Sequence, residues 1–235
     1  MSLFVTFEGP DGSGKTTQIR LLRAYLEEQG YPVYQTREPG GTSIGDQIRQ
    51  VLHDTANTEI RATTEILLYS ASRAQLVEEV IRPALAAGQI VLCDRYAEST
   101  LAYQGYGRGL DLDTLQTITA FATGRLRPDL IVYLDIPTEE GLRRKRRAHE
   151  TENDEWNRLD QESIDFHEGA RRGYWRLAEQ EPDRWLIVDA CQPVEVIQQG
   201  VRQAVLSRLA ASDIGGQRIR VDGREERTGR HVGRG

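Results

Sequence analysis

The segment Gly9–Thr16, with the sequence Gly-Pro-Asp-Gly-Ser-Gly-Lys-Thr, constrains the fold of this chain more than any other feature. Its spacing, Gly-x-x-x-x-Gly-Lys-[Ser/Thr], is that of a phosphate-binding P-loop, in which backbone N–H groups face phosphate oxygens. The apolar run Leu3–Phe7 directly precedes the loop, and apolar residues at helical spacing follow it from Thr16 to Gln29. Strand, loop and helix therefore come in the order that a P-loop requires.

Lys15 is one of only two lysines in the chain, beside 28 arginines. In a P-loop this compact ammonium reaches the β- and γ-phosphates, whereas an arginine is broader and planar and does not simply replace it. The Thr16 hydroxyl is the expected Mg²⁺ ligand. The residues predicted to bind ATP are Gly9, Pro10, Asp11, Gly12, Ser13, Gly14, Lys15, Thr16 and Thr17.

The composition is that of one ordinary α/β domain of 235 residues, with 38% hydrophobic and 28% charged residues. No apolar run approaches the ~20 residues that cross a bilayer, and a predicted strand begins at Leu3, so we expect neither a membrane segment nor a signal peptide. Cys93 and Cys191 lack disulfide-framework or metal-ligand spacing, which favours the reducing cytoplasm. The net charge of -6 argues against general nucleic-acid binding.

Helical and apolar β-like segments alternate along the chain, which predicts a doubly wound, five-stranded parallel sheet with helices on both faces. Polar residues follow each predicted strand, where such sheets bind ligands. The domain is expected to span residues 1–211, followed by a flexible tail at 212–235 that has few large apolar side chains. The predicted strands are Leu3–Phe7, Val33–Thr36, Ile90–Cys93, Leu130–Leu134 and Trp185–Val188.

Asp94 and Arg95 follow the third predicted strand. An aspartate at that position beside a P-loop can orient Mg²⁺ through water, and the adjacent arginine can bind a second phosphate with two hydrogen bonds. Taken alone, the pair is equally compatible with a surface Asp-Arg contact.

The run Arg143–Arg147 places five basic residues just after the fourth predicted strand. Such a run usually forms a solvated helix face. Its position favours a mobile lid, at about residues 141–160, that brings positive charge to the transferred phosphoryl group and excludes water.

These segments together resemble the thymidylate kinase family, whose members are nucleoside monophosphate kinases. The resemblance runs from about Leu3 to Leu209, and its most specific string is Thr36–Thr42, Thr-Arg-Glu-Pro-Gly-Gly-Thr. The other strings that carry it are Phe7–Thr17, Asp94–Tyr96, Ala102–Gly105 and Pro128–Leu130. The resemblance implies transfer of the ATP γ-phosphate to dTMP in dTTP synthesis, Mg²⁺ dependence and a homodimer.

The resemblance also implies roles for single residues. Asp11 would accept a hydrogen bond from the deoxyribose 3′-hydroxyl, and Arg95 would hold the dTMP phosphate. Tyr69 and Arg73, four residues apart and so on one helix face, would stack on thymine and bond one of its carbonyls. Tyr103 would crowd the sugar 2′ position. The remaining residues expected in the dTMP pocket are Arg37, Arg49, Ser99, Thr100 and Gln104.

The lid departs from the common bacterial pattern. It is longer, from Ala148 through Trp156, and closes as Asn157-Arg158-Leu159-Asp160. Its catalytic arginine therefore stays open among Arg144, Arg146, Arg147 and Arg158, with Arg146 and Arg158 taken as the candidates that act with Lys15, Asp94 and Arg95.

Two other functions are compatible with part of this pattern. Another nucleotide or deoxynucleoside kinase could use the same scaffold, and a nucleotide-binding regulatory module could have lost turnover. A GTPase is disfavoured, because with only Lys15 and Lys145 the chain has no Asn-Lys-x-Asp guanine motif. ADP formation on adding dTMP and ATP with Mg²⁺ separates the kinase from the regulatory module.

Overall fold

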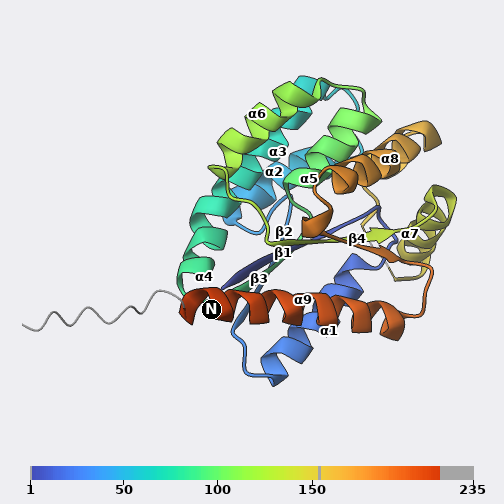
Figure 1. The fold of residues 1–235 in the computed structure, drawn as a ribbon. Coiled ribbons are helices and arrows are strands. Elements are labelled where there is room, and N and C mark those ends of the chain that lie inside the picture. Colours follow the sequence, from blue (N-terminus) through green and yellow to red (C-terminus); the bar gives the residue numbers. More distant parts are fainter. Residues whose placement is uncertain (1, 153–154, 218–235) are drawn as a thin grey trace, which may run out of the picture.

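The computed structural model describes residues 2–152 and 155–217, which fold around a five-stranded sheet of parallel strands. The strand order is β2-β3-β1-β4-β5 (Figure 1). The chain runs from β1 to the edge strand β2, returns to β3 beside β1, and then crosses to β4 and β5 on the other side, which confirms the predicted doubly wound α/β sheet. The strands are β1 (Leu3–Glu8), β2 (Val33–Arg37), β3 (Ile90–Asp94), β4 (Leu130–Asp135) and β5 (Trp185–Asp189).

Each strand runs one residue further than its apolar segment predicted. The ladder continues through polar residues, pairing Arg37 with Asp94 and Asp135 with Asp189. A ladder is made of backbone hydrogen bonds, so a polar side chain does not end it. The consequence is that charged side chains stand at the carboxyl edge of the sheet.

Helices cover both faces of the sheet, with α1 and α9 on one face and α3, α5, α6 and α8 on the other (Figure 1). The helices are α1 (Lys15–Glu28), α2 (Ser43–His53), α3 (Ala62–Leu76), α4 (Arg82–Ala86), α5 (Ala97–Thr100), α6 (Leu112–Thr123), α7 (Thr138–Glu152), α8 (Ile164–Gln180) and α9 (Val194–Gln217). Val77–Ile81 and Leu101–Gly107 are π-helical, and Arg158–Gln161 and Pro182–Arg184 are 3₁₀ turns.

The core lies on both sides of β1 because alternate side chains point to opposite faces. Val5 and Phe7 are buried against side chains of α1 and α9, while Phe4 packs with Leu76 and Val77 under the other layer. A strand buried on both faces reads as a continuous apolar run, as Leu3–Phe7 does.

Helix α9 continues to Gln217, so the tail expected from residue 212 begins inside a helix. A helix is held by backbone hydrogen bonds and does not require large apolar side chains, so the change in composition at residue 212 does not end it. The rest of the expected tail, 218–235, lies outside the described residues. Among the helices that the structure describes, none has the length and apolarity to span a bilayer.

Candidate active site

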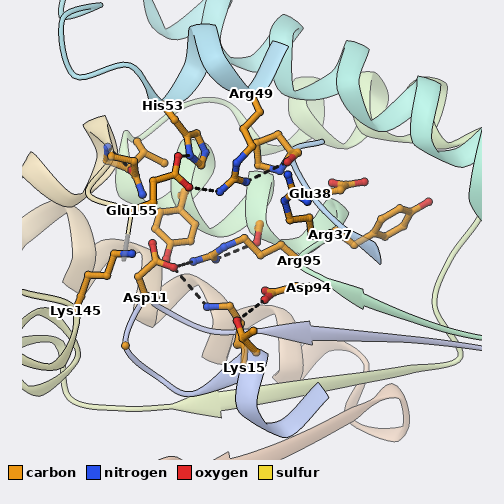
Figure 2. Close-up of a pocket in the computed structure, with 18 of the residues that line it drawn as sticks. Asp11, Lys15, Arg37, Glu38, Arg49, His53, Asp94, Arg95, Lys145 and Glu155 are labelled. Atoms are coloured by element: carbon orange, nitrogen blue, oxygen red, sulfur yellow. Dashed lines mark hydrogen bonds and ion pairs between the residues drawn. The ribbon is translucent and has the colours of Figure 1, made fainter. Parts of the chain in front are cut away.

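A cavity of about 750 Å³ lies at the carboxyl ends of β1, β2 and β3 (Figure 2). Its lining joins the P-loop to residues far away in the sequence. Among the residues predicted as functional, the lining includes Asp11, Gly12, Gly14, Lys15, Thr16, Thr17, Arg37, Arg49, Tyr69, Arg73, Asp94, Arg95, Ser99, Thr100, Tyr103 and Gln104. Gly9, Pro10 and Ser13 belong to the same loop without lining the cavity.

Lys15 is the first residue of α1 and only 6% exposed. Its ammonium donates hydrogen bonds to the carbonyl oxygens of Gly9 and Pro10, both at 3.0 Å. Burial lowers the pKa of Lys15, since a desolvated ammonium is costly. The charge is thus fixed where loop N–H groups and the positive end of the helix dipole favour an anion.

Thr16 and Asp94 bring two oxygen ligands together beside the loop. The Thr16 hydroxyl donates to Asp94 Oδ2 at 3.2 Å. Among residues 2–152 and 155–217 no cluster of three or more His, Cys, Asp or Glu side chains could hold a metal ion. A cation here would therefore take most of its ligands from phosphates and water, as Mg²⁺ does in kinases.

Asp11 links Lys15 to Arg95. Its Oδ1 atom lies 2.8 Å from Arg95 Nη2 and 3.6 Å from Lys15 Nζ (Figure 2). Burial disfavours the Asp11 carboxylate, but the charges of Arg95, Lys15 and Lys145 outweigh burial and hold its pKa well below the usual range. The guanidinium of Arg95 also lies over the Tyr103 ring, 5.2 Å from the ring centroid.

The backbone at Arg95 is strained. Its φ of 70° lies in the left-handed region, which costs a residue other than glycine on the order of 1 kcal/mol. The Arg95 N–H donates to the Phe7 carbonyl at 2.9 Å, and Cys93 Sγ contacts the Arg95 carbonyl at 3.0 Å. The turn after β3 thus holds the guanidinium toward the P-loop.

Arg73 is a buried arginine, 1% exposed, on the cavity wall. Its Nε atom donates to Glu38 Oε2 at 2.7 Å, and Nη2 donates to the Tyr96 carbonyl and to Thr100 Oγ1. Arg73 Nη1 and Glu38 Oε1 are buried polar atoms without a partner among the described residues. Burial raises the pKa of Glu38 to about 7, against the opposing charge of Arg73. Leaving such atoms unpaired is costly, which marks this wall as a place for a ligand.

A contact that the sequence did not predict joins the lid to α2. Glu155 accepts from Arg49 Nη2 at 2.5 Å and lies 2.8 Å from His53 Nδ1 (Figure 2). These bonds, that of His53 first, lower the pKa of Glu155 to about 2. Arg37, by contrast, is half exposed and pairs with Asp46 at 3.0 Å.

The two arginines favoured for the lid do not line the cavity. Arg146 is exposed on α7, and the Arg158 guanidinium is buried against Glu65. Glu65 also accepts from Arg108 and Gln104. The lid residues that line the cavity are Arg144, Lys145, Ala148, Glu155, Asn157 and Leu159. Only the periodicity of the basic run, Lys145 being four residues after Gly141, could have separated the inward from the outward positions.

Comparison with known proteins agrees with this geometry. The family model described as Thymidylate kinase matches residues 7–201. The chain belongs to the thymidylate kinase family. It is 55% identical over 219 residues to the thymidylate kinase of Roseiflexus castenholzii, covering 90% of this chain and 96% of that protein. The thymidylate kinase of Geotalea uraniireducens is 50% identical, with 89% and 99% covered.

The crystal structure of thymidylate kinase from Ehrlichia chaffeensis superposes with a TM-score of 0.69 at 30% identity and covers 87% of this chain and 98% of that one. As a thymidylate kinase, the enzyme uses ATP to phosphorylate dTMP to dTDP, a step of dTTP biosynthesis. The expectations about family, fold and reaction are therefore confirmed.

Proposed function

We propose that the cavity has a donor half on the P-loop and an acceptor half around Arg95, with Asp11 between them. The observation that carries this proposal is the Asp11 carboxylate, whose Oδ1 atom is close to both Lys15 and Arg95. In this arrangement Lys15 holds the ATP phosphates and Arg95 holds the dTMP phosphate. The Asp11 carboxylate accepts a hydrogen bond from the 3′-hydroxyl of the acceptor sugar.

The acceptor half is built for a thymine base and a deoxyribose. Tyr69 offers a ring for stacking, and the unpartnered Nη1 of Arg73 offers a donor for a thymine carbonyl. Ser99, Thr100 and Gln104 lie along the same wall, and the Tyr103 ring under Arg95 leaves little space for a ribose 2′-hydroxyl. Arg37 and Arg49 complete the positive lining on the other side.

Mg²⁺ is the implied cofactor, and the residues present fit it. Thr16 and Asp94 would hold it, the hydroxyl directly and the carboxylate through water, since both are oxygen ligands. When bound, Mg²⁺ neutralises charge on the β- and γ-phosphates of ATP. The chain's own part is to align the two phosphates and to exclude water, because phosphoryl transfer asks for little covalent chemistry from the protein.

We expect an assembly and a compartment as well. Leu67 on α3 and Phe121 on α6 are 55% and 89% exposed, and these helices pack side by side (Figure 1). Such apolar side chains are typical of a subunit interface, which supports the homodimer implied by the family. Free thiols at Cys93 and Cys191 support a reducing compartment, the cytoplasm.

Replacement of Arg95 tests the division of the cavity. Arg95→Ala should raise the Kd for dTMP at least ~10-fold and leave the Kd for ATP within about threefold, because charge-assisted hydrogen bonds to phosphate are lost on one side only. Isothermal titration with each nucleotide measures both constants. Arg172→Ala, exposed on α8, is the control and should change neither. A larger loss of ATP affinity than of dTMP affinity would assign Arg95 to the donor half.

A further inference from the structure

Helix α7 carries five consecutive basic residues, and its helical phase sorts them. Gly141, Lys145 and Ala148 lie on one face, while Arg143, Arg146 and Arg147 are exposed. Arg144 lies at the border, where it pairs with Glu140 at 2.7 Å and donates to the Ala190 carbonyl at 3.0 Å. Lys145 is the one residue of this run whose side chain is buried, with 7% of its surface exposed.

Two glycines set this phase by bringing α7 against the P-loop. A Cβ atom on Gly12 would lie 2.3 Å from the Gly141 carbonyl oxygen and 3.1 Å from the Lys145 backbone nitrogen. A Cβ atom on Gly141 would in turn lie 3.2 Å from the Asp11 carbonyl oxygen. Only a side-chain-free contact allows this approach, and it fixes the start of the Lys145 side chain directly over the loop.

The Lys145 side chain extends from that contact along the wall of the cavity toward Asp11. It lines the cavity together with Lys15 and Arg95, and Figure 2 shows its ammonium directed toward Asp11. Its charge is one of those that hold the Asp11 pKa low, and it also acts on Asp160 in the lid turn. Both lysines of the chain therefore converge on the carboxylate that lies between the donor and acceptor halves.

We propose that Lys145 is a catalytic residue that contacts the transferred phosphoryl group, in place of a lid arginine. This inference rests on the proposed division of the cavity. In the transfer, an oxygen of the dTMP phosphate bonds to the γ-phosphorus while the bond from that phosphorus to the bridging oxygen breaks. ADP leaves with the electron pair, and no proton moves because both phosphates are ionised. Lys145 gives no proton and supplies positive charge to the equatorial oxygens.

The chemistry suits a lysine at this point. An ammonium is a compact charge that fits a buried position beside a packed loop, whereas an arginine fork is broader. Arg158, the arginine with a comparable burial, already has its guanidinium against Glu65 and contacts the Leu52 carbonyl, so it stabilises the lid turn. Arg146 has its side chain on the solvent face.

The test compares Lys145→Met with Arg143→Met in the full-length enzyme. Both remove one positive charge from α7, but Arg143 is 65% exposed and pairs with Glu140 outside the cavity. Lys145→Met should lower kcat by about 100-fold or more, as the loss of one transition-state contact does, with KM for dTMP and ATP within about threefold. Arg143→Met should stay within about threefold in every constant, and Lys145→Arg should recover part of kcat.

A binding measurement tests the role of Lys145 even if Lys145→Met lowers the amount of folded enzyme. ADP, dTMP and aluminium fluoride with Mg²⁺ form an analogue of the transition state, so aluminium fluoride should tighten nucleotide binding in the wild type. Lys145→Met should lose that gain and keep its affinity for ADP alone and dTMP alone. An unchanged kcat, or an unchanged gain from aluminium fluoride, would overturn the assignment. A loss of dTMP affinity with an unchanged kcat would also overturn it, because Lys145 would then act only through its electrostatic interaction with Asp11.

Discussion

At the scale of single residues, the site depends on charges that are buried and paired. Glu8, at the end of β1, is fully buried and accepts hydrogen bonds from the Tyr96 N–H, Ser99 and Tyr174. Burial raises its pKa to about 7, and the nearby Glu98 charge acts in the same direction. Arg95 precedes Tyr96 and Ser99 lies on α5 directly after it, so Glu8 supports the acceptor half from beneath.

Glu8 should make stability depend on pH. Its folded pKa is above the unfolded value of 4.5, so its contribution is present below about pH 4.5 and is lost as pH rises through about 7. The difference in unfolding free energy between wild type and Glu8→Gln should therefore fall between about pH 4.5 and about pH 7, by on the order of 3 kcal/mol as an upper bound. Urea unfolding across this range measures it. A difference that is flat or rises with pH would contradict the buried-acid account.

The Thr16 hydroxyl should set the Mg²⁺ requirement of the enzyme. Thr16→Val keeps the shape of the side chain and removes an expected Mg²⁺ ligand. The Mg²⁺ concentration for half-maximal activity should rise about tenfold or more, while binding of ATP without Mg²⁺ changes little. Titration of activity with MgCl₂ at fixed ATP gives the answer, and an unaltered Mg²⁺ requirement would remove Thr16 from the metal site.

At the scale of elements, the lid is where prediction from the sequence was weakest. The position of the basic run after β4 indicated a lid. Helical spacing separates the two faces of the run Arg143–Arg147, but it does not reveal which face points inward. That depends on a contact between Gly12 and Gly141, residues far apart in the chain. The bonds of Glu155 to Arg49 and His53 were unpredictable for the same reason, because a surface Glu has no local pattern that names its partner.

Arg158 should act on lid docking and stability. Its guanidinium and that of Arg108 share the Glu65 carboxylate, which is 1% exposed and whose pKa is lowered by these hydrogen bonds despite burial. Arg158→Met should reduce the free energy of unfolding by ~1–3 kcal/mol, because a hydrogen bond to a buried charge is lost. Urea denaturation measures this loss. Unaltered stability combined with a fall in kcat of about 100-fold would instead return Arg158 to catalysis.

At the scale of the whole molecule, the fold followed from local signals. Five apolar runs separated by helical patterns predicted the sheet, and the P-loop fixed the first strand, loop and helix. The acceptor wall was harder, because Glu38, Arg73 and Thr100 come from three segments whose meeting point depends on strand order. The resemblance to a family supplied Arg73 and Thr100, which periodicity alone would not have found, and the role of Glu38 as the buried partner of Arg73 was not predicted.

Leu67 on α3 and Phe121 on α6 form the exposed apolar surface that we propose as the subunit interface. Phe121→Glu should shift the enzyme from dimer to monomer at micromolar concentration, since a charge would be buried in the interface. Gln203→Glu adds the same charge on exposed α9, on the other face of the sheet, and should leave the assembly unchanged. Sedimentation velocity separates the two masses. A wild-type protein that sediments as a monomer would contradict the inferred homodimer.

We propose that the acceptor half of one cavity selects dTMP. The most direct test of this selection is the value of kcat/KM for dTMP, dUMP, UMP, dCMP and AMP with ATP and Mg²⁺. We predict the highest value for dTMP, a loss of roughly 10-fold or more without the thymine methyl, and a larger loss for UMP, which adds a 2′-hydroxyl against Tyr103. Equal values for dTMP and UMP would contradict both the base and the sugar assignments.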